Sequence, residues 1–515
     1  MKRIIKGALL SLPVGVATIY LGSCSLDDAN KTVTAIKTED QFQITGATTC
    51  SLVQYNGQDS IYSVPSHYTN PADGKIYYVT EISYGAFNLS GFSENSVLTH
   101  LTIPATVTKI AESTFENCSQ LTNIVVSVAN ATYSSDEGVL YDKEKKNLIK
   151  YPAQKSETNY KTPISVENIS ANAFKQNTHI EKLELSEKVT SIGTDAFLGC
   201  SALTEVNIPS DITEIKKNTF KDCIALSAVD IPDGVTAIQA GAFQGSGIKS
   251  VALPSSVETV EHSAFNHCEQ LETVTLSDSM TKITDSLFQD CVSLYEVTIP
   301  DSITHIAPFA FAGCIALESI EIPNSVLTMQ NNIFEGCTNL STVMLSDSIS
   351  KIAKNTFKDC VNLTVVVLPD SVTEIESYAF KNCKNLININ FPEKITSLGK
   401  NTFSDCVSLG KVILPPNLKS LSDSVFANSK IEELHIPANT TSVSASSFNK
   451  ATIGTVIIDS SSFSDTYARQ FFSKLLRCEY VYIADELTVN NYISNNYTQV
   501  TKSDMDGYKE FTKNK

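Results

Sequence analysis

The feature that most constrains this chain is a phenylalanine that returns every 23 residues. The hexapeptide NTFKDC occurs at Asn218–Cys223 and again, unchanged, at Asn355–Cys360. Thirteen phenylalanines follow this ruler, and every step is 23 residues except two of 22: Phe174, Phe197, Phe220, Phe243, Phe265, Phe288, Phe311, Phe334, Phe357, Phe380, Phe403, Phe426 and Phe448. Such a period is typical of a solenoid, in which each repeat contacts only its neighbours. It argues against the roughly three independent domains that the length alone would suggest.

A single repeat shows what each unit can form. In LTEVNIPSDITEIKKNTFKDCIA, Leu203–Ala225, Val206 and Ile208 alternate with polar residues, which predicts a short strand with one face inside. Pro209 ends that strand because it has no N–H for a ladder. A second apolar pair follows, and the Phe then lies in a turn or short helical stretch. A unit this small cannot bury its apolar side alone, so the repeats must stack and share one core.

This pattern resembles the BspA-type leucine-rich repeat, and LPDSVTEIESYAFKNCKNL, Leu368–Leu386, is nearly its motif. The resemblance covers roughly Glu39 to Val500. It implies a leucine-rich-repeat solenoid, an α/β horseshoe of mostly short parallel strands with turns or short helical segments. About 13 regular 23-residue repeats would be closed by caps. The strands are expected on a concave face.

The resemblance also sets expected boundaries. It implies an N-terminal cap over 39–80, repeats over 81–458 with a hairpin insert near 131–165, and a C-terminal cap and tail over 459–515. Within the insert, GVLYDKEKKNLIKYP, Gly138–Pro152, predicts two strands around a charged turn. Tyr467–Leu476 is expected to form a short helix. The polar residues from about Lys502 onward are expected to be frayed.

The first residues are a different kind of sequence. Lys2, Arg3 and Lys6 precede a mostly apolar stretch without acidic residues, which predicts a signal peptide over 1–23. LGSC, ending at Cys24, resembles a bacterial lipobox, which implies lipidation of Cys24 and a lipid-anchor linker over 24–38. Ordinary signal cleavage with Cys24 unmodified is the alternative. The expected location is therefore exported and lipid-anchored to a bacterial membrane, at the cell surface.

The cysteines indicate packing rather than chemistry. Ten of the 13 lie three residues after a repeat aromatic: Cys118, Cys200, Cys223, Cys268, Cys291, Cys314, Cys337, Cys360, Cys383 and Cys406. A regular column of this kind predicts reduced, buried thiols that behave as small apolar side chains. Three turns that are one residue shorter, FQGSGI, FANSKI and FNKATI, lack the cysteine, so we expect the longer turn alone to create its slot.

The sequence contains no motif for catalysis, for a metal or for a cofactor. The seven histidines have no zinc-type spacing, and His262 beside Cys268 is better explained by the repeat. A formal charge of −17 argues against nucleic acid as a partner. The chain is therefore predicted to be no enzyme.

What remains for function is a surface. Each strand exposes two outward residues, and these two columns contain apolar side chains in the second half of the repeats. Lined-up apolar groups on an exposed face can mark a partner site, although β-branched residues also simply favour strands. The candidate ligand-binding residues are Met344, Val365, Val367, Ile413 and His435.

The first hypothesis is a cell-surface protein that binds a protein ligand through the concave sheet. Resemblance to BspA-like proteins implies adhesion, either to host extracellular matrix proteins such as fibronectin or fibrinogen or to a bacterial surface protein. The alternative is a structural or scaffold lipoprotein of the cell envelope. In both, the membrane is reached through the lipid anchor.

Overall fold

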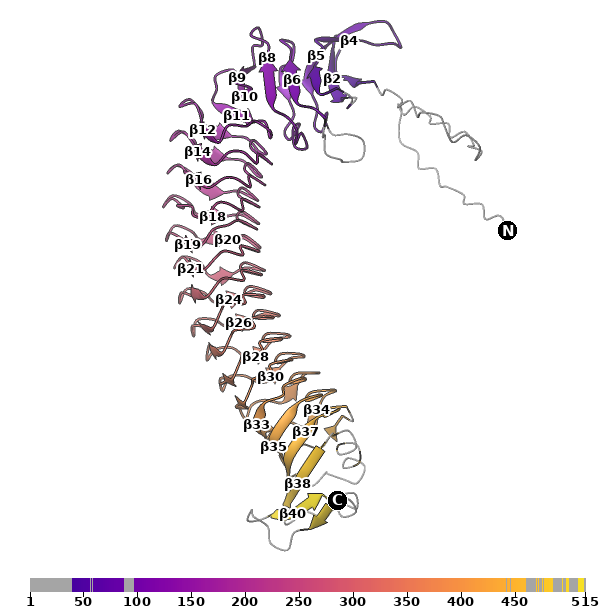
Figure 1. The fold of residues 1–515 in the computed structure, drawn as a ribbon, viewed down its shortest axis with the longest axis vertical. Helices are drawn as coiled ribbons and strands as arrows, with labels where there is room; N and C mark the ends of the chain where they lie inside the picture. Colours follow the sequence, from indigo (N-terminus) through magenta and orange to yellow (C-terminus); the bar gives the residue numbers. More distant parts are fainter. Residues whose placement is uncertain are drawn as a thin grey trace, which may run out of the picture. The chain divides into compact units, whose positions relative to one another are not determined.

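Two rows of short parallel strands run along most of the described chain. The computed structural model describes residues 39–55, 57, 59–87, 97–440, 442–444, 446–459, 469, 471, 475, 477–484, 493, 497–499 and 508–513. The predicted signal peptide, the linker and Cys24 lie outside these residues, as does most of the helix expected over Tyr467–Leu476. Figure 1 shows successive repeats stacked from β12 (Asn159–Lys161) to β38 (Arg477–Ala484), which confirms the solenoid.

The first row holds the strands that contain the alternating apolar residues at the start of each repeat. Its strands are β3 (Ile61–Ser63), β6 (His100–Ile103), β8 (Asn123–Val126), β12, β14 (Lys182–Glu184), β16 (Glu205–Val206), β19 (Ser250–Ala252), β21 (Thr273–Thr275), β23 (Glu296–Thr298), β25 (Ser319–Glu321), β27 (Thr342–Met344), β29 (Val365–Val366), β31 (Asn388–Ile389), β33 (Leu409–Ile413), β35 (Lys430–Ile436), β37 (Thr452–Ile458) and β38. Neighbouring strands pair in parallel one repeat apart, for example Val251 with Val274, and Val274 with Val297.

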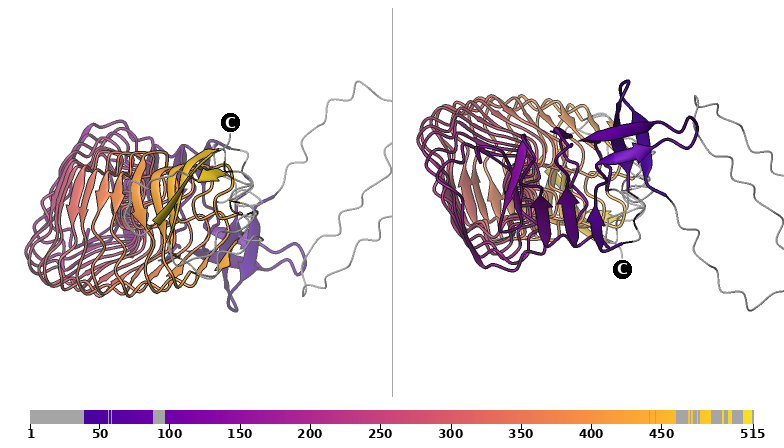
Figure 2. Two further views of the ribbon diagram at one scale, coloured as in Figure 1. Left: turned by 90° about the horizontal axis from the view of Figure 1, so that it is seen from below. Right: turned by 90° about the horizontal axis from the view of Figure 1, so that it is seen from above.

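The second row holds the strands that precede each aromatic ring of the repeats, and all of them are two residues long except β11. Its strands are β7 (Lys109–Ile110), β11 (Asn147–Lys150), β13 (Asn168–Ile169), β15 (Ser191–Ile192), β17 (Glu214–Ile215), β18 (Ala237–Ile238), β20 (Thr259–Val260), β22 (Lys282–Ile283), β24 (His305–Ile306), β26 (Thr328–Met329), β28 (Lys351–Ile352), β30 (Glu374–Ile375), β32 (Ser397–Leu398), β34 (Ser420–Leu421) and β36 (Ser442–Val443). Figure 2 looks along the stack and shows the turns of successive repeats following one path.

The Phe column forms the centre of the core between the rows. From Phe174 to Phe448 each ring lies 5.3–5.8 Å from the next, centroid to centroid. Tyr151, 23 residues before Phe174, takes the same place at 5.0 Å, and the sequence analysis missed it. Each ring therefore packs against the rings of the neighbouring repeats.

The backbone conformation explains why Asn and Asp occur in both copies of the hexapeptide NTFKDC. Asn218 and Asp222 are left-handed, with φ of 51° and 58°, and so are Asn355 and Asp359 in the second copy. Asn and Asp tolerate this conformation better than most residues. Thr219 is buried, and its Oγ1 donates to the Lys216 carbonyl at 2.7 Å. The segment around each Phe is thus a turn that is bent sharply on both sides of the ring.

The cysteine column is buried and free, as predicted. In nine repeats, from Cys200 to Cys406, Sγ donates to the carbonyl of the Phe one repeat earlier, at 3.0–3.2 Å. The expectation that shorter turns have no slot is wrong, because Ser246, Ser429 and Ala451 are buried in the equivalent place. The shorter turns lack a residue that comes after the cysteine position. The position itself is therefore still present, and Ser or Ala occupies it instead of Cys.

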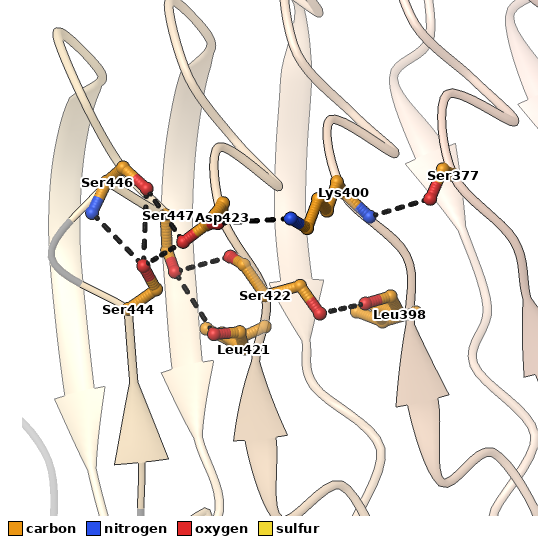
Figure 3. A network of polar contacts seen from close by, with 9 residues as sticks. All are labelled: Ser377, Leu398, Lys400, Leu421, Ser422, Asp423, Ser444, Ser446 and Ser447. Atoms are coloured by element: carbon orange, nitrogen blue, oxygen red, sulfur yellow. Dashed lines mark hydrogen bonds and ion pairs between the residues drawn. The ribbon is translucent and has the colours of Figure 1, made fainter.

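Polar side chains join neighbouring repeats beside β34 and β36 (Figure 3). Ser444 and Ser446 both donate to the Asp423 carboxylate, and Lys400 Nζ lies 3.5 Å from its other oxygen. These hydrogen bonds, that of Ser444 first, lower the pKa of Asp423. Ser447 Oγ donates to the Ser422 carbonyl at 2.7 Å. These Ser and Asp residues therefore act in contacts between neighbouring repeats.

The first part of the chain forms a sheet of its own. Its strands are β1 (Gln41–Ile44), β2 (Thr49–Gln54), β4 (His67–Thr69) and β5 (Ile76–Ile82), in the order β1-β2-β5-β4, with β7 of the second row paired to β5. Two of its pairings, β1 with β2 and β4 with β5, are antiparallel.

The two strands expected within Gly138–Pro152 are both present, and a third strand precedes them. β9 (Tyr133–Asp136) and β10 (Val139–Asp142) join through the left-handed pair Glu137 and Gly138, a geometry that suits a two-residue hairpin. β10 then pairs antiparallel with β11, which continues the second row by pairing in parallel with β13. The sequence missed β9 because Tyr-Ser-Ser-Asp carries little strand signal.

The last residues are also more ordered than predicted. The expectation of a frayed tail is wrong for Tyr508–Lys513, which form β40. β40 pairs antiparallel with β38 and with β39 (Tyr497–Gln499), so the first-row sheet continues through β40 and ends at β39. Phe511 is buried, and the Tyr508 hydroxyl donates to Asp459 at 2.6 Å. These two contacts could not be predicted from the sequence, because the segment that contains them is mostly polar.

Candidate binding surface

Three of the predicted residues form a cluster on the first row. Met344 ends β27, Val365 begins β29, and Val367 follows β29 one repeat after Met344. Their side chains are 60 %, 45 % and 67 % exposed. We call these three residues the apolar patch. Side chains this exposed contribute little to the core.

The patch lies in a stretch of the first row that exposes no charge. The outward residues of β27, β29 and β31 and the residue after each strand are uncharged, and they include Thr342 and Asn388. The strands on either side expose charged residues, Glu321 on one side and Lys411 on the other. Lys411 Nζ lies 2.8 Å from the carboxylate of Glu433. In a chain with a formal charge of −17, this is a surface from which water can be removed at low cost.

Asn390, the next member of the Met344–Val367 column, has a structural use. Its Oδ1 accepts from the Leu368 N–H at 2.7 Å, and its Nδ2 donates to the Leu368 carbonyl at 3.0 Å. Asn207 does the same to Leu185, at 2.7 and 3.0 Å. The amide thus replaces a missing strand partner where the ladder ends. Sequence reasoning missed this role, although Asn at an outward strand position is a usable signal.

Asn390→Ala is expected to expose the Leu368 backbone and to lower the free energy of unfolding by about 1–2 kcal/mol, because two hydrogen bonds are lost. Asn388→Ala, in the same strand and without those bonds, should change it by less than about 0.5 kcal/mol. Hydrogen–deuterium exchange of the peptide containing Leu368, together with urea denaturation, measures both effects. Equal exchange in the two variants would contradict this role of Asn390.

Ile413 and His435 lie apart from the patch. Ile413 is half exposed and pairs in register with His435, but Asn390 stands between it and Val367. His435 Nε2 lies 2.5 Å from Asp459, the carboxylate that also accepts from Tyr508. His435 therefore connects β35 to the final strands, and only Met344, Val365 and Val367 are brought together.

The other end of the first row is charged and hollowed. A depression of about 440 Å³ lies over β12, β14 and β16. Lys161 contacts Glu184, and Lys182 Nζ lies 2.9 Å from Glu205, so its charges are paired between repeats. Tyr160 and Leu183 form part of its lining. This part of the first row therefore exposes paired charges, whereas the apolar patch exposes no charge.

The structure brings no metal-ligand set together in the part of the chain that it describes. Cys268, next to His262 and His267 in sequence, is fully buried and donates to the Phe243 carbonyl. His267 lies 3.4 Å from Asp290 instead. Among the described residues no helix has the length and apolar character that a membrane crossing requires.

The comparison with protein families decides the class. The model of the BspA type leucine rich repeat region matches residues 78–157, 151–272, 258–387 and 350–476, which together cover more than half of the chain. The chain belongs to the BspA-type leucine-rich repeat family. The resemblance seen in the sequence is therefore confirmed, and so is the leucine-rich-repeat solenoid.

Solved structures with similar folds come from several bacteria. A leucine-rich cell surface protein of Faecalibacterium prausnitzii is 25 % identical, with a TM-score of 0.44, and the match covers 74 % of this chain and 94 % of that one. A leucine-rich repeat protein of Bacteroides ovatus is 18 % identical, with a TM-score of 0.47, over 88 % and 97 %. The Treponema pallidum leucine-rich repeat protein is 24 % identical, with a TM-score of 0.32, over 37 % and 90 %. No curated protein matches the chain.

Proposed function

We propose that this BspA-type protein is a non-enzymatic binding protein that contacts a protein ligand through the apolar patch of the first row. The supporting observation is the cluster of Met344, Val365 and Val367 on strands without charge. Side chains of this kind form the desolvated centre of protein interfaces. Ile413 and His435 would border the contact one and two repeats beyond Asn390.

The location completes the proposal. The signal peptide over 1–23 and lipidation of Cys24 would attach the chain to a bacterial membrane, with the repeats at the cell surface. Acyl chains contribute about 0.8 kcal/mol per buried methylene, so several chains on one cysteine hold a protein without a spanning helix. The ligand would then be a host extracellular matrix protein or a bacterial surface protein, and the protein would act as an adhesin.

Met344→Asp with Val367→Asp is expected to weaken binding at least about tenfold, because two charges would be buried without partners. The assay is solid-phase binding of the mature chain, from Ser25 onward, to matrix proteins and mucins at physiological salt. The matched control, Ile315→Asp with Leu327→Asp, adds the same charge to neighbouring repeats. Both control residues are exposed, at 44 % and 52 %, and lie outside the first-row strands.

The outcomes separate the hypotheses. Binding lost in the patch variant and kept in the control supports an adhesin that uses the first row. Equal binding by both variants contradicts the patch. If the unmodified chain binds no member of the panel, the alternative of a structural or scaffold lipoprotein gains, and proteolysis of intact cells then tests it, since a periplasmic scaffold is protected.

A further inference from the structure

A second concave site lies where the insert joins the stack, away from the apolar patch. A cavity of about 300 Å³ opens beside β7 and β11, a volume at the lower end for small-molecule sites. Its apolar lining includes Ile110, Phe115, Tyr133 and Ile149. Its polar lining comes from Glu112, Ser113, Glu116, Lys150, Ser170 and Asn172 among others. Two of these polar groups are buried in ways that the repeat does not explain.

Lys150 is a cation in a column of small and apolar side chains. The residue just before each ring is Thr114, Ala173 or Ala196 in neighbouring repeats, but here it is a lysine that is 2 % exposed. Its Nζ donates to the Asn172 carbonyl at 2.9 Å, and no carboxylate of the described residues lies within 4 Å of it. Burial lowers the pKa of Lys150 to about 8, so the amine is still protonated at pH 7.

Asn172 leaves an acceptor unused in the same cavity. It is 6 % exposed and left-handed, with φ of 58°. Its Nδ2 donates to Ser113 Oγ at 3.0 Å, and its Oδ1 has no hydrogen-bond partner among the described residues. Buried polar atoms are nearly always paired, and a buried cation is costly unless it is paired as well. A cation without a carboxylate partner and an acceptor without a hydrogen bond therefore belong to residues that line one small cavity.

We propose that this cavity binds a small organic acid that carries a hydroxyl or amine group beside its carboxylate and has a short apolar chain. The carboxylate would accept from Lys150, and the neighbouring O–H or N–H would donate to Asn172 Oδ1. The apolar chain would contact Ile110, Phe115 and Ile149. This site is independent of the proposed adhesive surface, and its test does not involve the patch.

The probes are four molecules with the same branched carbon chain. They are 2-hydroxy-4-methylpentanoate, L-leucine, 4-methylpentanoate and 4-methylpentane-1,2-diol, titrated into the mature chain by calorimetry at pH 7. The hydroxy acid or leucine is expected to bind saturably in the millimolar range, and the stronger of the two identifies the donor. The plain acid should bind several-fold more weakly, and the diol should not bind, since it offers nothing to an ammonium group.

Lys150→Met keeps the apolar volume and should weaken binding at least about tenfold, because a charged hydrogen bond is lost. Lys175→Met is the control, because Lys175 is a neighbouring lysine paired with Glu116 at 3.0 Å that does not line the cavity. Circular dichroism checks that both variants are folded. Failure of both the hydroxy acid and leucine to bind, or unchanged binding by folded Lys150→Met, would overturn the proposal. Equal binding of 4-methylpentanoate would overturn the part assigned to Asn172.

Discussion

Raising the pH above about 10 is expected to unfold the stack in one steep step. The thiols of the cysteine column have raised pKa values because of burial, to about 12 for Cys118, Cys200, Cys268 and Cys337. A raised pKa in the folded state means that the folded chain holds its protons longer than the unfolded chain, whose thiols ionise near pH 8.5. Stability from these groups is therefore complete below that pH and falls as the pH rises toward 12.

The effect is large because the groups repeat. Each thiol costs about 1.4 kcal/mol of stability per pH unit in this window, and ten such thiols act together. Buried tyrosines such as Tyr141, whose pKa is raised to about 12 by burial, act in the same direction. Far-UV circular dichroism against pH gives the midpoint and the steepness of the step.

Cys314→Ala is the matched variant for this titration. In this variant, unfolding at high pH is expected to release about one proton fewer, so stability should depend less steeply on pH. The contributions of the other thiols should not change. Thiol labelling with an aromatic disulfide at pH 8 gives an independent reading, since the buried thiols should react only in denaturant. Rapid labelling of the folded chain, or a fold that persists unchanged at pH 12, would contradict a buried, protonated column.

Phe311→Ala is expected to lower the free energy of unfolding by about 3–5 kcal/mol, the usual cost of such a cavity. Phe311 is fully buried, and its ring lies 5.6 Å from Phe288 and 5.7 Å from Phe334, so two stacked contacts are lost with it. Because repeats contact only their neighbours, the damage should be local. Limited proteolysis should then cut first near this repeat, and urea denaturation should show the loss.

Phe309, two residues earlier, gives the control. It is 36 % exposed and left-handed, with φ of 57°, a conformation that costs most residues about 1–2 kcal/mol and Asn less. Phe309→Asn should therefore leave stability unchanged or raise it by up to about 1 kcal/mol. Similar losses in the two variants would mean that the stacked column does not carry the stability of the repeats.

The stacking of the repeats, the buried cysteines and the outward strand residues could be predicted because the same sequence pattern occurs in many repeats. The regular spacing of the Phe residues locates each repeat, and the cysteine position lies three residues after each Phe. The alternation of apolar and polar residues in the strands predicts that Met344, Val365 and Val367 point away from the core. The family resemblance follows from the same letters. Each of these inferences rests on many copies of one pattern, so a single unusual residue does not disturb it.

What could not be predicted depends on contacts between single residues. Tyr151 replaces a Phe, and only its distance of 23 residues from Phe174 signals this. The pairing of His435 with Asp459, and of Asp459 with Tyr508, joins segments that periodicity does not relate. Lys150 reads as an ordinary surface lysine, and only the structure shows that it is buried beside Asn172 of the next repeat. Spacing alone contains no information about which of these side chains meet.

The most direct test of the central claim, that ligand covers the first row at the apolar patch, is the oxidation rate of Met344. This side chain is 60 % exposed, whereas Met280 and Met329 are buried at 1 % and 4 % and serve as internal references. Mild peroxide treatment followed by mass spectrometry of the peptides gives all three rates. With the tightest-binding protein of the panel at saturation, oxidation of Met344 should slow toward that of the buried pair. An unchanged rate at Met344 in the saturated complex would contradict the account.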